Sequence, residues 1–180
     1  MKTVSLHIGY GKTGTTAQQH ALNRGRQILD KNGVHYLHAE DEGRGIGHQD
    51  LAKSFIVDRP AYMQPPREPA ELRCRVKQEL RSSASDTFLI SSENFPFANA
   101  ENVLDYLNDA LPGADINVIL FARSQDELVE AEYNQLVKML ELTSTINSYA
   151  NENKDNYDFH AMLQQWQARV GTSNIICRVY

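Results

Sequence analysis

Residues 7–16 read His-Ile-Gly-Tyr-Gly-Lys-Thr-Gly-Thr-Thr, and this stretch decides the fold. The residues before it, Thr3 to Ile8, are apolar or β-branched and predict a short strand. The residues after it, Thr15 to Lys31, predict a helix that ends before Gly33. A glycine-rich loop therefore joins a strand to the start of a helix. Free amides, the helix dipole and the Lys12 ammonium all favour an anion there, so the sequence predicts a phosphate-binding loop.

The loop differs from the Walker A loop, which needs a glycine five positions before its final Gly-Lys-Thr. Leu6, inside the predicted strand, holds that position relative to Gly11. The run instead resembles the 5′-phosphosulfate loop of sulfotransferases that use 3′-phosphoadenosine 5′-phosphosulfate (PAPS), where Pro-Lys-Thr-Gly-Thr-Thr follows the first strand. Gly11 stands where the proline is usual, which removes no ligand group. The alternative interpretation is a turn rich in glycine and threonine with a solvent-exposed lysine.

A second run, Phe121 to Gln135, resembles the 3′-phosphate element of the same family. In that element an arginine ends a strand, and a serine eight positions later joins it on the 3′-phosphate. Arg123 matches the arginine, and its guanidinium suits a bidentate grip on phosphate. Ala131 replaces the serine. A hydrogen bond to a charged group contributes about 1.5–3 kcal/mol, so we expect weaker nucleotide binding.

Polar residues near Arg123 allow two further interpretations. Ser124 or Asn134 can compensate for the missing serine hydroxyl. Alternatively, Arg123 pairs only with Asp126 or Glu127 in the first turn of the following helix.

Strand-like and helix-like segments alternate along the rest of the chain. Strands are predicted at Val34–Leu37, Thr87–Ser91, Ile116–Ala122 and Asn174–Tyr180, and helices at His48–Ile56, Glu71–Ser82, Glu101–Leu111, from Ser124 onward and at Asp158–Val170. This alternation predicts an α/β fold with a parallel sheet between two layers of helices. The resemblance makes it a P-loop-like, nucleotide-binding sulfotransferase fold, and we expect one domain over residues 1–180. The segments after the first, third and fourth strands fall at the carboxyl ends of strands, where such folds bind ligands.

Composition restricts the classes of partner and compartment. The chain has 180 residues, 41% of them hydrophobic, and a net charge of −5, which disfavours a nucleic-acid-binding surface. The sequence lacks a signal peptide and an apolar run of membrane length, so we expect a cytoplasmic protein. Cys74 and Cys177 are expected to be free thiols, buried or half-buried. The six histidines carry no metal-binding frame, so no metal is expected.

The resemblance implies an enzyme that transfers a sulfuryl group from PAPS to a hydroxyl or amine acceptor and releases 3′,5′-adenosine diphosphate. Bacterial relatives with this layout act on carbohydrate or other hydroxyl acceptors. The resemblance further implies that the 5′-phosphate is held by Gly11, Lys12, Thr13, Gly14, Thr15 and Thr16, and the 3′-phosphate by Arg123. Lys12 also meets the charge that grows on the leaving group. Family members usually continue beyond the fifth strand, so we expect a domain without its usual C-terminal part.

A general base is needed to accept the acceptor's proton. His48 is the first candidate, because imidazole titrates near neutral pH and follows a polar loop, and because related bacterial sequences often carry a similar histidine before Leu-Ala. Glu40 or Glu42 in that loop is the rival. Glu93, in Ser-Ser-Glu after the third strand, is expected to orient Lys12 or the acceptor. A structural role for His48 and a capping or surface role for Glu93 are the alternatives.

Two other functions compete with sulfuryl transfer. A P-loop small-molecule kinase would bind ATP with Mg²⁺ and needs an acidic strand end, whereas the fourth strand is followed by Arg123. A non-catalytic or vestigial nucleotide-binding domain of the same fold is favoured by Ala131 and by the absent C-terminal part. No motif identifies the acceptor, which can be a sugar, a lipid or a phenol, or the oligomeric state.

Overall fold

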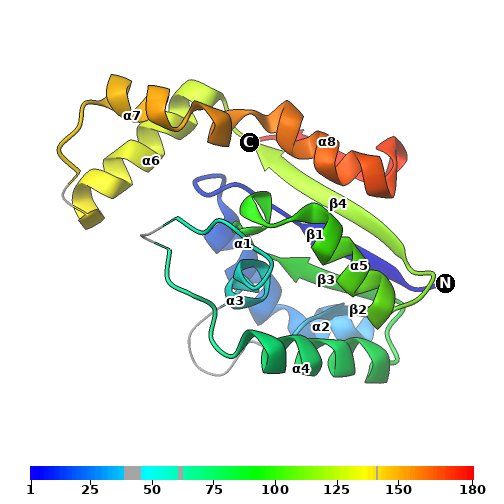
Figure 1. Ribbon diagram of the computed structural model, residues 1–180. Helices are drawn as coiled ribbons and strands as arrows, with labels where there is room; N and C mark the ends of the chain where they lie inside the picture. The colour runs from blue at the N-terminus through cyan, green and yellow to red at the C-terminus, as the bar shows by residue number, and fades with distance from the viewer. Residues whose placement is uncertain (39–45, 61–62, 141) are drawn as a thin grey trace.

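The computed structural model describes residues 1–38, 46–60, 63–140 and 142–180 of the chain. Over these residues the strands form one sheet with the order β2-β3-β1-β4-β5 (Figure 1), and each neighbouring pair is parallel. The strands are β1 (Thr3–His7), β2 (Val34–Tyr36), β3 (Thr87–Ser91), β4 (Asp115–Ala122) and β5 (Ile175–Val179). The predicted α/β fold with a parallel sheet is confirmed.

Helices connect these strands and cover both faces of the sheet (Figure 1). The α-helices are α1 (Thr15–Arg24), α2 (Arg26–Lys31), α3 (Gln49–Lys53), α4 (Pro69–Ser82), α5 (Ala100–Ala110), α6 (Gln125–Leu140), α7 (Ile146–Glu152) and α8 (Phe159–Val170). Single 3₁₀ turns lie at Phe95–Phe97, Lys154–Tyr157 and Thr172–Asn174. Connections between parallel strands are right-handed. The chain leaves β1 toward one edge of the sheet and leaves β2, β3 and β4 toward the other edge, so α1 and α2 lie on the face opposite to α4, α5 and α8.

The hydrophobic core lies mainly on one face of the sheet. In β4 the residues Ile116, Val118 and Leu120 are buried, whereas the alternate residues are only partly buried. In β1 the same alternation holds from Thr3 to Leu6, whereas His7 is buried on the other face. The near-continuous apolar sequence of β4 predicts a strand covered on both faces, but only one face is fully covered. The short helices α1 and α2 leave part of the other face accessible.

Two local features differ from the predicted helices. The single helix predicted over Thr15–Lys31 is divided at Gly25, whose N–H caps α1 by donating to the carbonyl of Ala21 at 2.9 Å. Glycine in a helix interior is unfavourable by roughly 1 kcal/mol relative to alanine, which explains why the helix ends there. The helix α7 was not predicted; it begins at Ile146 and is capped by Thr145, whose side chain accepts from the N–H of Ser148.

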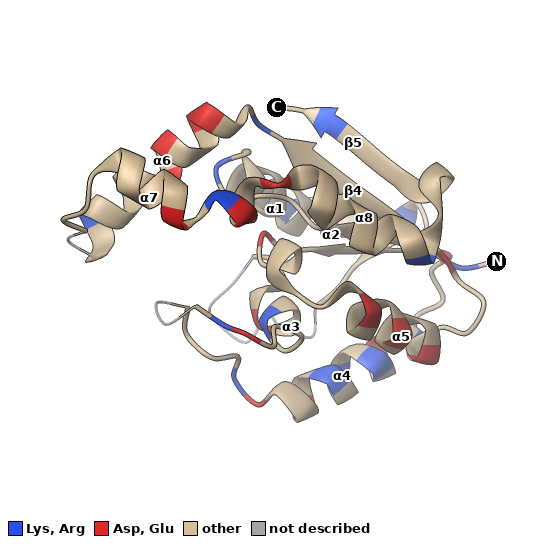
Figure 2. Cartoon of the chain, turned by 45° about the horizontal axis from the view of Figure 1, so that its top comes forward, with Lys and Arg blue, Asp and Glu red and all other residues tan. Residues whose placement is uncertain are grey.

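Charged side chains join the helices of one face at the surface. Figure 2 shows basic residues of α4 beside acidic residues of α5. Lys77 and Arg81 both pair with Asp109, and Arg169 of α8 pairs with Glu101. Exposed ion pairs contribute about 0–1 kcal/mol each, so these pairs need no functional interpretation.

The structure also bears on the two cysteines and on the possibility of membrane-spanning helices. Cys74 and Cys177 are free, as predicted, but exposed rather than buried. Within the described ranges, the helices are all too short or too polar to cross a membrane.

Candidate functional site

The two predicted phosphate-binding elements meet where the strand order reverses. The chain leaves β1 toward β2 and leaves the neighbouring β4 toward β5, and ligands of open α/β sheets bind in the crevice at such a point. The loop of residues 8–14 follows β1, and Arg123 follows β4. Arg123 Nη1 donates to the carbonyl of Lys12 at 3.3 Å. The structure therefore brings Lys12 and Arg123 together at the carboxyl edge of the sheet.

The loop is held in shape by its own threonines. The hydroxyls of Thr13 and Thr15 are buried and donate to the carbonyl of Tyr10 at 2.7 and 2.9 Å. Thr16 is exposed at the start of α1. Lys12 and Gly14 have φ angles of 65° and 73°, which lie in the left-handed region that L-residues other than glycine adopt rarely. The threonine hydroxyls thus fix the loop backbone, which leaves its amides to serve a ligand.

The first turn of α1 has the features of an anion-binding helix N-terminus. The capping residue Gly14 supplies no side-chain hydrogen bond, and the first turn of α1 contains no acidic residue. Helix N-termini in this state bind anions through their free N–H groups and the helix dipole. A Cβ on Gly14 would lie 2.9 Å from the exposed Tyr180 ring, and the φ of 73° disfavours any residue other than glycine there. The predicted loop residues therefore fit a bound phosphate.

A buried imidazole that sequence reasoning missed lies beneath the loop. Gln19 Nε2 donates to Ser91 Oγ at 3.3 Å, and Ser91 Oγ lies 2.8 Å from His7 Nδ1. Which of the two atoms donates depends on the tautomer of the imidazole. Among the described residues His7 Nε2 has no hydrogen-bond partner. A Cβ on Gly9 would lie 3.0 Å from this nitrogen, so a ring nitrogen without a partner lies directly against the loop.

A cavity of about 190 Å³ opens beside the loop. Its lining includes Lys12, Glu93 and Glu132, together with the aromatic side chains of Tyr10, Phe97 and Tyr149. Burial raises the pKa of Glu93 and of Glu132, and the nearby Lys12 ammonium partly opposes the rise for both carboxyls. The structure thus places two proton-accepting groups next to Lys12, and one of them, Glu93, was predicted.

Glu132 was not predicted as a site residue, although its position on α6 carried a signal. It falls between Leu128 and Leu136 at helical spacing, so a carboxylate interrupts the apolar stripe of the helix. Tyr157 Oη donates to Glu132 Oε2 at 2.8 Å and lies 3.0 Å from the hydroxyl of Tyr149. This contact holds one carboxylate oxygen, while Oε1 lies 3.8 Å from the position of a Cβ on Gly11. Glu132 is thereby oriented toward the loop.

His48 lies away from this cavity, and both of its ring nitrogens are engaged. The N–H of Ser91 donates to His48 Nδ1 at 2.9 Å, and His48 Nε2 donates to the carbonyl of Leu37 at 3.2 Å. The side chain is buried, and burial lowers its pKa to about 4. A neutral imidazole with both nitrogens bonded to backbone fits the structural alternative. Glu40 and Glu42, the rival bases, lie outside the described residues.

The surroundings of Arg123 contain both predicted kinds of contact. Besides the bond to Lys12, Arg123 Nε donates to Glu127 Oε2 at 2.9 Å. Ser124 hydrogen-bonds to Asp126 and lowers the pKa of that carboxyl, so its hydroxyl serves the first turn of α6. The ion-pair alternative is therefore present together with the contact to the loop.

The fold is similar to that of a sulfotransferase of known structure. A crystal structure of a sulfotransferase from Alicyclobacillus acidocaldarius matches 99% of this chain and 73% of its own, with a TM-score of 0.60 and 12% sequence identity. At this identity the likeness shows the fold alone. No protein-family model matches the chain, and no curated protein matches it.

Proposed function

We propose that this chain is a PAPS-dependent sulfotransferase whose acceptor enters the cavity beside Lys12. The observation that carries the proposal is the contact between the two anion-binding elements, in which Arg123 Nη1 meets the Lys12 carbonyl at 3.3 Å. PAPS, when bound, supplies an activated sulfuryl group joined to a phosphate leaving group. A loop with free amides at one end of the crevice and a guanidinium beside it suits a ligand with two separate phosphates. The fold shared with a sulfotransferase agrees with this proposal.

The loop and Lys12 would stabilise negative charge. In-line transfer of a sulfuryl group resembles phosphoryl transfer, in which positioning and charge stabilisation account for most of the catalysis. The amides at the start of α1 would hold the 5′-phosphate, and the Lys12 ammonium would neutralise the charge that develops on the leaving group. Arg123 would hold the 3′-phosphate and orient the donor.

Glu132 is the group that we assign to accept the acceptor's proton. It lines the same cavity as Lys12, and its pKa is raised by burial, which makes the carboxylate a stronger base at neutral pH. Tyr157 holds Oε2, so the proton would go to Oε1. Glu93 lines the same cavity and would orient Lys12, one of the two roles that the sequence analysis gives it. The proposal thus moves the basic role from His48 to Glu132.

Nucleotide binding tests the proposal without knowledge of the acceptor. We expect 3′,5′-adenosine diphosphate to raise the thermal midpoint, 5′-AMP to raise it less, and ATP with Mg²⁺ to have little effect. Lys12→Ala and Arg123→Ala should reduce the response, whereas Lys138→Ala, an exposed lysine near the end of α6, should not. A larger response to ATP with Mg²⁺ would favour a kinase, and no response to any nucleotide would overturn the proposal.

Transfer of labelled sulfate then separates an enzyme from a binding domain. PAPS labelled in its sulfuryl group is offered with glucosamine, N-acetylglucosamine and a phenol as acceptors. We expect a labelled product, lost in Glu132→Gln and retained in Glu130→Gln, an exposed glutamate on the same helix. Binding of 3′,5′-adenosine diphosphate without transfer to any acceptor would favour the non-catalytic alternative.

A further inference from the structure

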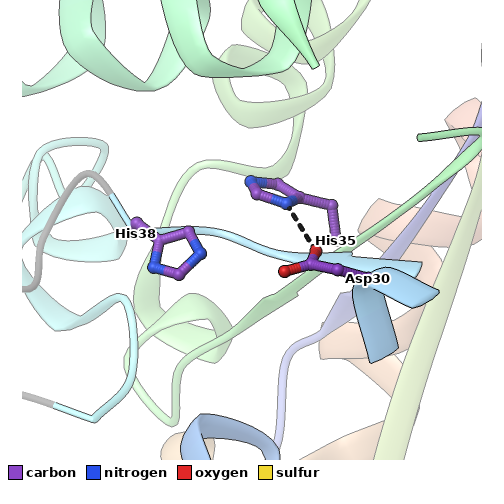
Figure 3. A group of neighbouring side chains, drawn as sticks. All are labelled: Asp30, His35 and His38. Atoms are coloured by element: carbon purple, nitrogen blue, oxygen red, sulfur yellow. Dashed lines mark hydrogen bonds and ion pairs between the residues drawn. The ribbon is translucent and has the colours of Figure 1, made fainter. Parts of the chain in front are cut away.

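A second group of polar side chains gathers at the β2 edge of the sheet, away from the cavity. Figure 3 shows Asp30 from the end of α2, His35 from β2 and His38 from the residues just after β2. One ligand atom from each residue lies within 4.8 Å of the others. The imidazole rings of His35 and His38 are 5.2 Å apart between centroids. Three potential ligands thus lie close together at this edge of the sheet.

The distance between two of these ligand atoms is close to that of a metal site. His35 Nδ1 lies 3.0 Å from Asp30 Oδ1. With metal–ligand bonds of about 2.0–2.2 Å, two ligands of a tetrahedral zinc ion are about 3.3 Å apart. If His35 Nδ1 and Asp30 Oδ1 move apart by a few tenths of an ångström, an ion fits between them. Rotation of the exposed His38 side chain then supplies the third ligand.

Glu79 supports His35 from the other side of the ring. His35 Nε2 lies 2.7 Å from Glu79 Oε1, and the backbone N–H of His38 donates to the same oxygen at 2.6 Å. A histidine that binds metal through one nitrogen usually donates the other N–H to a carboxylate, which fixes the ring and its tautomer. With Nε2 bound to Glu79, the nitrogen that remains for a ligand is Nδ1, which faces Asp30.

We propose that Asp30, His35 and His38 bind a divalent transition-metal ion, for which Zn²⁺ is the probe, with Glu79 as the group that orients His35. Two imidazoles and one carboxylate suit zinc, nickel, copper or cobalt rather than magnesium or calcium, which prefer oxygen ligands. Asp30 is exposed and His35 only partly buried, so the ion can enter from solvent and keep a water as its fourth ligand. The ion would join α2, the edge strand β2 and, through Glu79, α4. This proposal is independent of sulfuryl transfer.

Metal titration of the purified full chain, without a polyhistidine tag, tests the site. We expect isothermal calorimetry to give one Zn²⁺ per chain, and Mg²⁺ to give no heat. Asp30→Asn and His38→Ala should each weaken binding at least tenfold, and Glu79→Gln should weaken it about tenfold through the orientation of His35. The control His20→Ala changes an exposed histidine on α1 and should leave binding unchanged.

Two further readouts decide between a metal site and an ion-pair cluster. Zn²⁺ should raise the thermal midpoint of the wild-type chain and of His20→Ala, but not that of His38→Ala. Asp30→Asn keeps the size of an exposed side chain, so loss of binding in this variant, with an unchanged circular dichroism spectrum, assigns the ligand rather than a folding defect. Absence of binding to the wild-type chain, or binding that survives both Asp30→Asn and His38→Ala, would overturn the proposal.

Discussion

The surroundings of Lys12 and of His48 are built in opposite ways, although both lie near the carboxyl edge of the sheet. Lys12 is exposed beside a cavity, and its ammonium faces two carboxyl groups. His48 is buried, and both ring nitrogens are bonded to the backbone of Ser91 and Leu37. A group that reacts with a substrate needs an unused donor or acceptor that the substrate can reach. The comparison therefore agrees with the proposed reactive role of the Lys12 region and indicates that His48 contributes to the stability of the fold.

Acidification should lower the free energy of unfolding more than any single substitution, because it acts on both buried histidines. Burial lowers the pKa of His7 and of His48 to about 4. Between about pH 6.5 and 4 the unfolded chain binds more protons than the folded chain, so the free energy of unfolding falls as the pH falls, by about 3 kcal/mol for each histidine. Urea denaturation from pH 7 to 4.5 measures this loss. Imidazole signals of His7 and His48 that titrate near pH 6.5 by NMR would break the comparison.

Replacement of His48 should lower the free energy of unfolding nearly as much. His48→Ala leaves a cavity and removes the partners of the Ser91 N–H and the Leu37 carbonyl, so the free energy of unfolding should fall by about 3 kcal/mol. Lys12→Ala removes an exposed side chain and should change it by less than about 0.5 kcal/mol. Equilibrium unfolding in urea compares the two variants. Equal losses would show that the two regions do not divide chemistry from stability.

Lys12→Ala should act on nucleotide binding instead. Loss of one hydrogen bond to a charged phosphate is expected to weaken the binding of 3′,5′-adenosine diphosphate by about 2 kcal/mol, or about 30-fold. Calorimetry gives the affinity, and His48→Ala, at a temperature where it remains folded, is the matched control. An affinity that falls more in His48→Ala than in Lys12→Ala would reverse the assignment.

A gain of affinity is expected at the position that departs from the sulfotransferase pattern. Ala131→Ser adds a hydroxyl on α6, the helix that follows Arg123, and should tighten the binding of 3′,5′-adenosine diphosphate about tenfold, or 1.4 kcal/mol. The affinity for 5′-AMP should not change, because 5′-AMP lacks the 3′-phosphate. An equal gain for both nucleotides would place the hydroxyl elsewhere than at the 3′-phosphate.

Removal of the ion pair between Arg123 and Glu127 should have the smallest effect on stability and on nucleotide affinity. Glu127→Gln removes a partly exposed partner at 2.9 Å and should change the stability by less than about 1 kcal/mol. Because the guanidinium is then available to a ligand, the affinity for 3′,5′-adenosine diphosphate should rise slightly. A large loss of affinity would show that Glu127 positions Arg123 rather than competing for it.

The loop is encoded in contiguous residues, because a strand, a glycine-rich turn and a helix follow one another in residues 3–24. The parallel sheet was predicted from the alternation of strands and helices along the whole chain. Arg123 was predicted because the residues around it resemble the 3′-phosphate element of the sulfotransferase family. The burial of His48 could not be predicted in this way. A histidine at the start of a helix has the same local sequence pattern whether it faces solvent or the backbone of β3.

The remaining groups depend on contacts between distant segments. Glu132 lies near the loop only because α6 begins beside it after β4, and Asp30, His35 and Glu79 meet only because α2, β2 and α4 lie together. No spacing in the sequence corresponds to these contacts. An interrupted apolar stripe, as at Glu132, is the kind of local signal that can be sought in advance.

The position of Tyr180 has a practical consequence for the preparation of the protein. Its ring lies against Gly14, so an affinity tag or fluorophore attached at residue 180 would lie beside the loop of residues 8–14 and would compete with any ligand offered there. Met1, which is 93% exposed, precedes β1 at the amino edge of the sheet, far along the strands from the loop. Labels and surface attachment should therefore be placed at Met1.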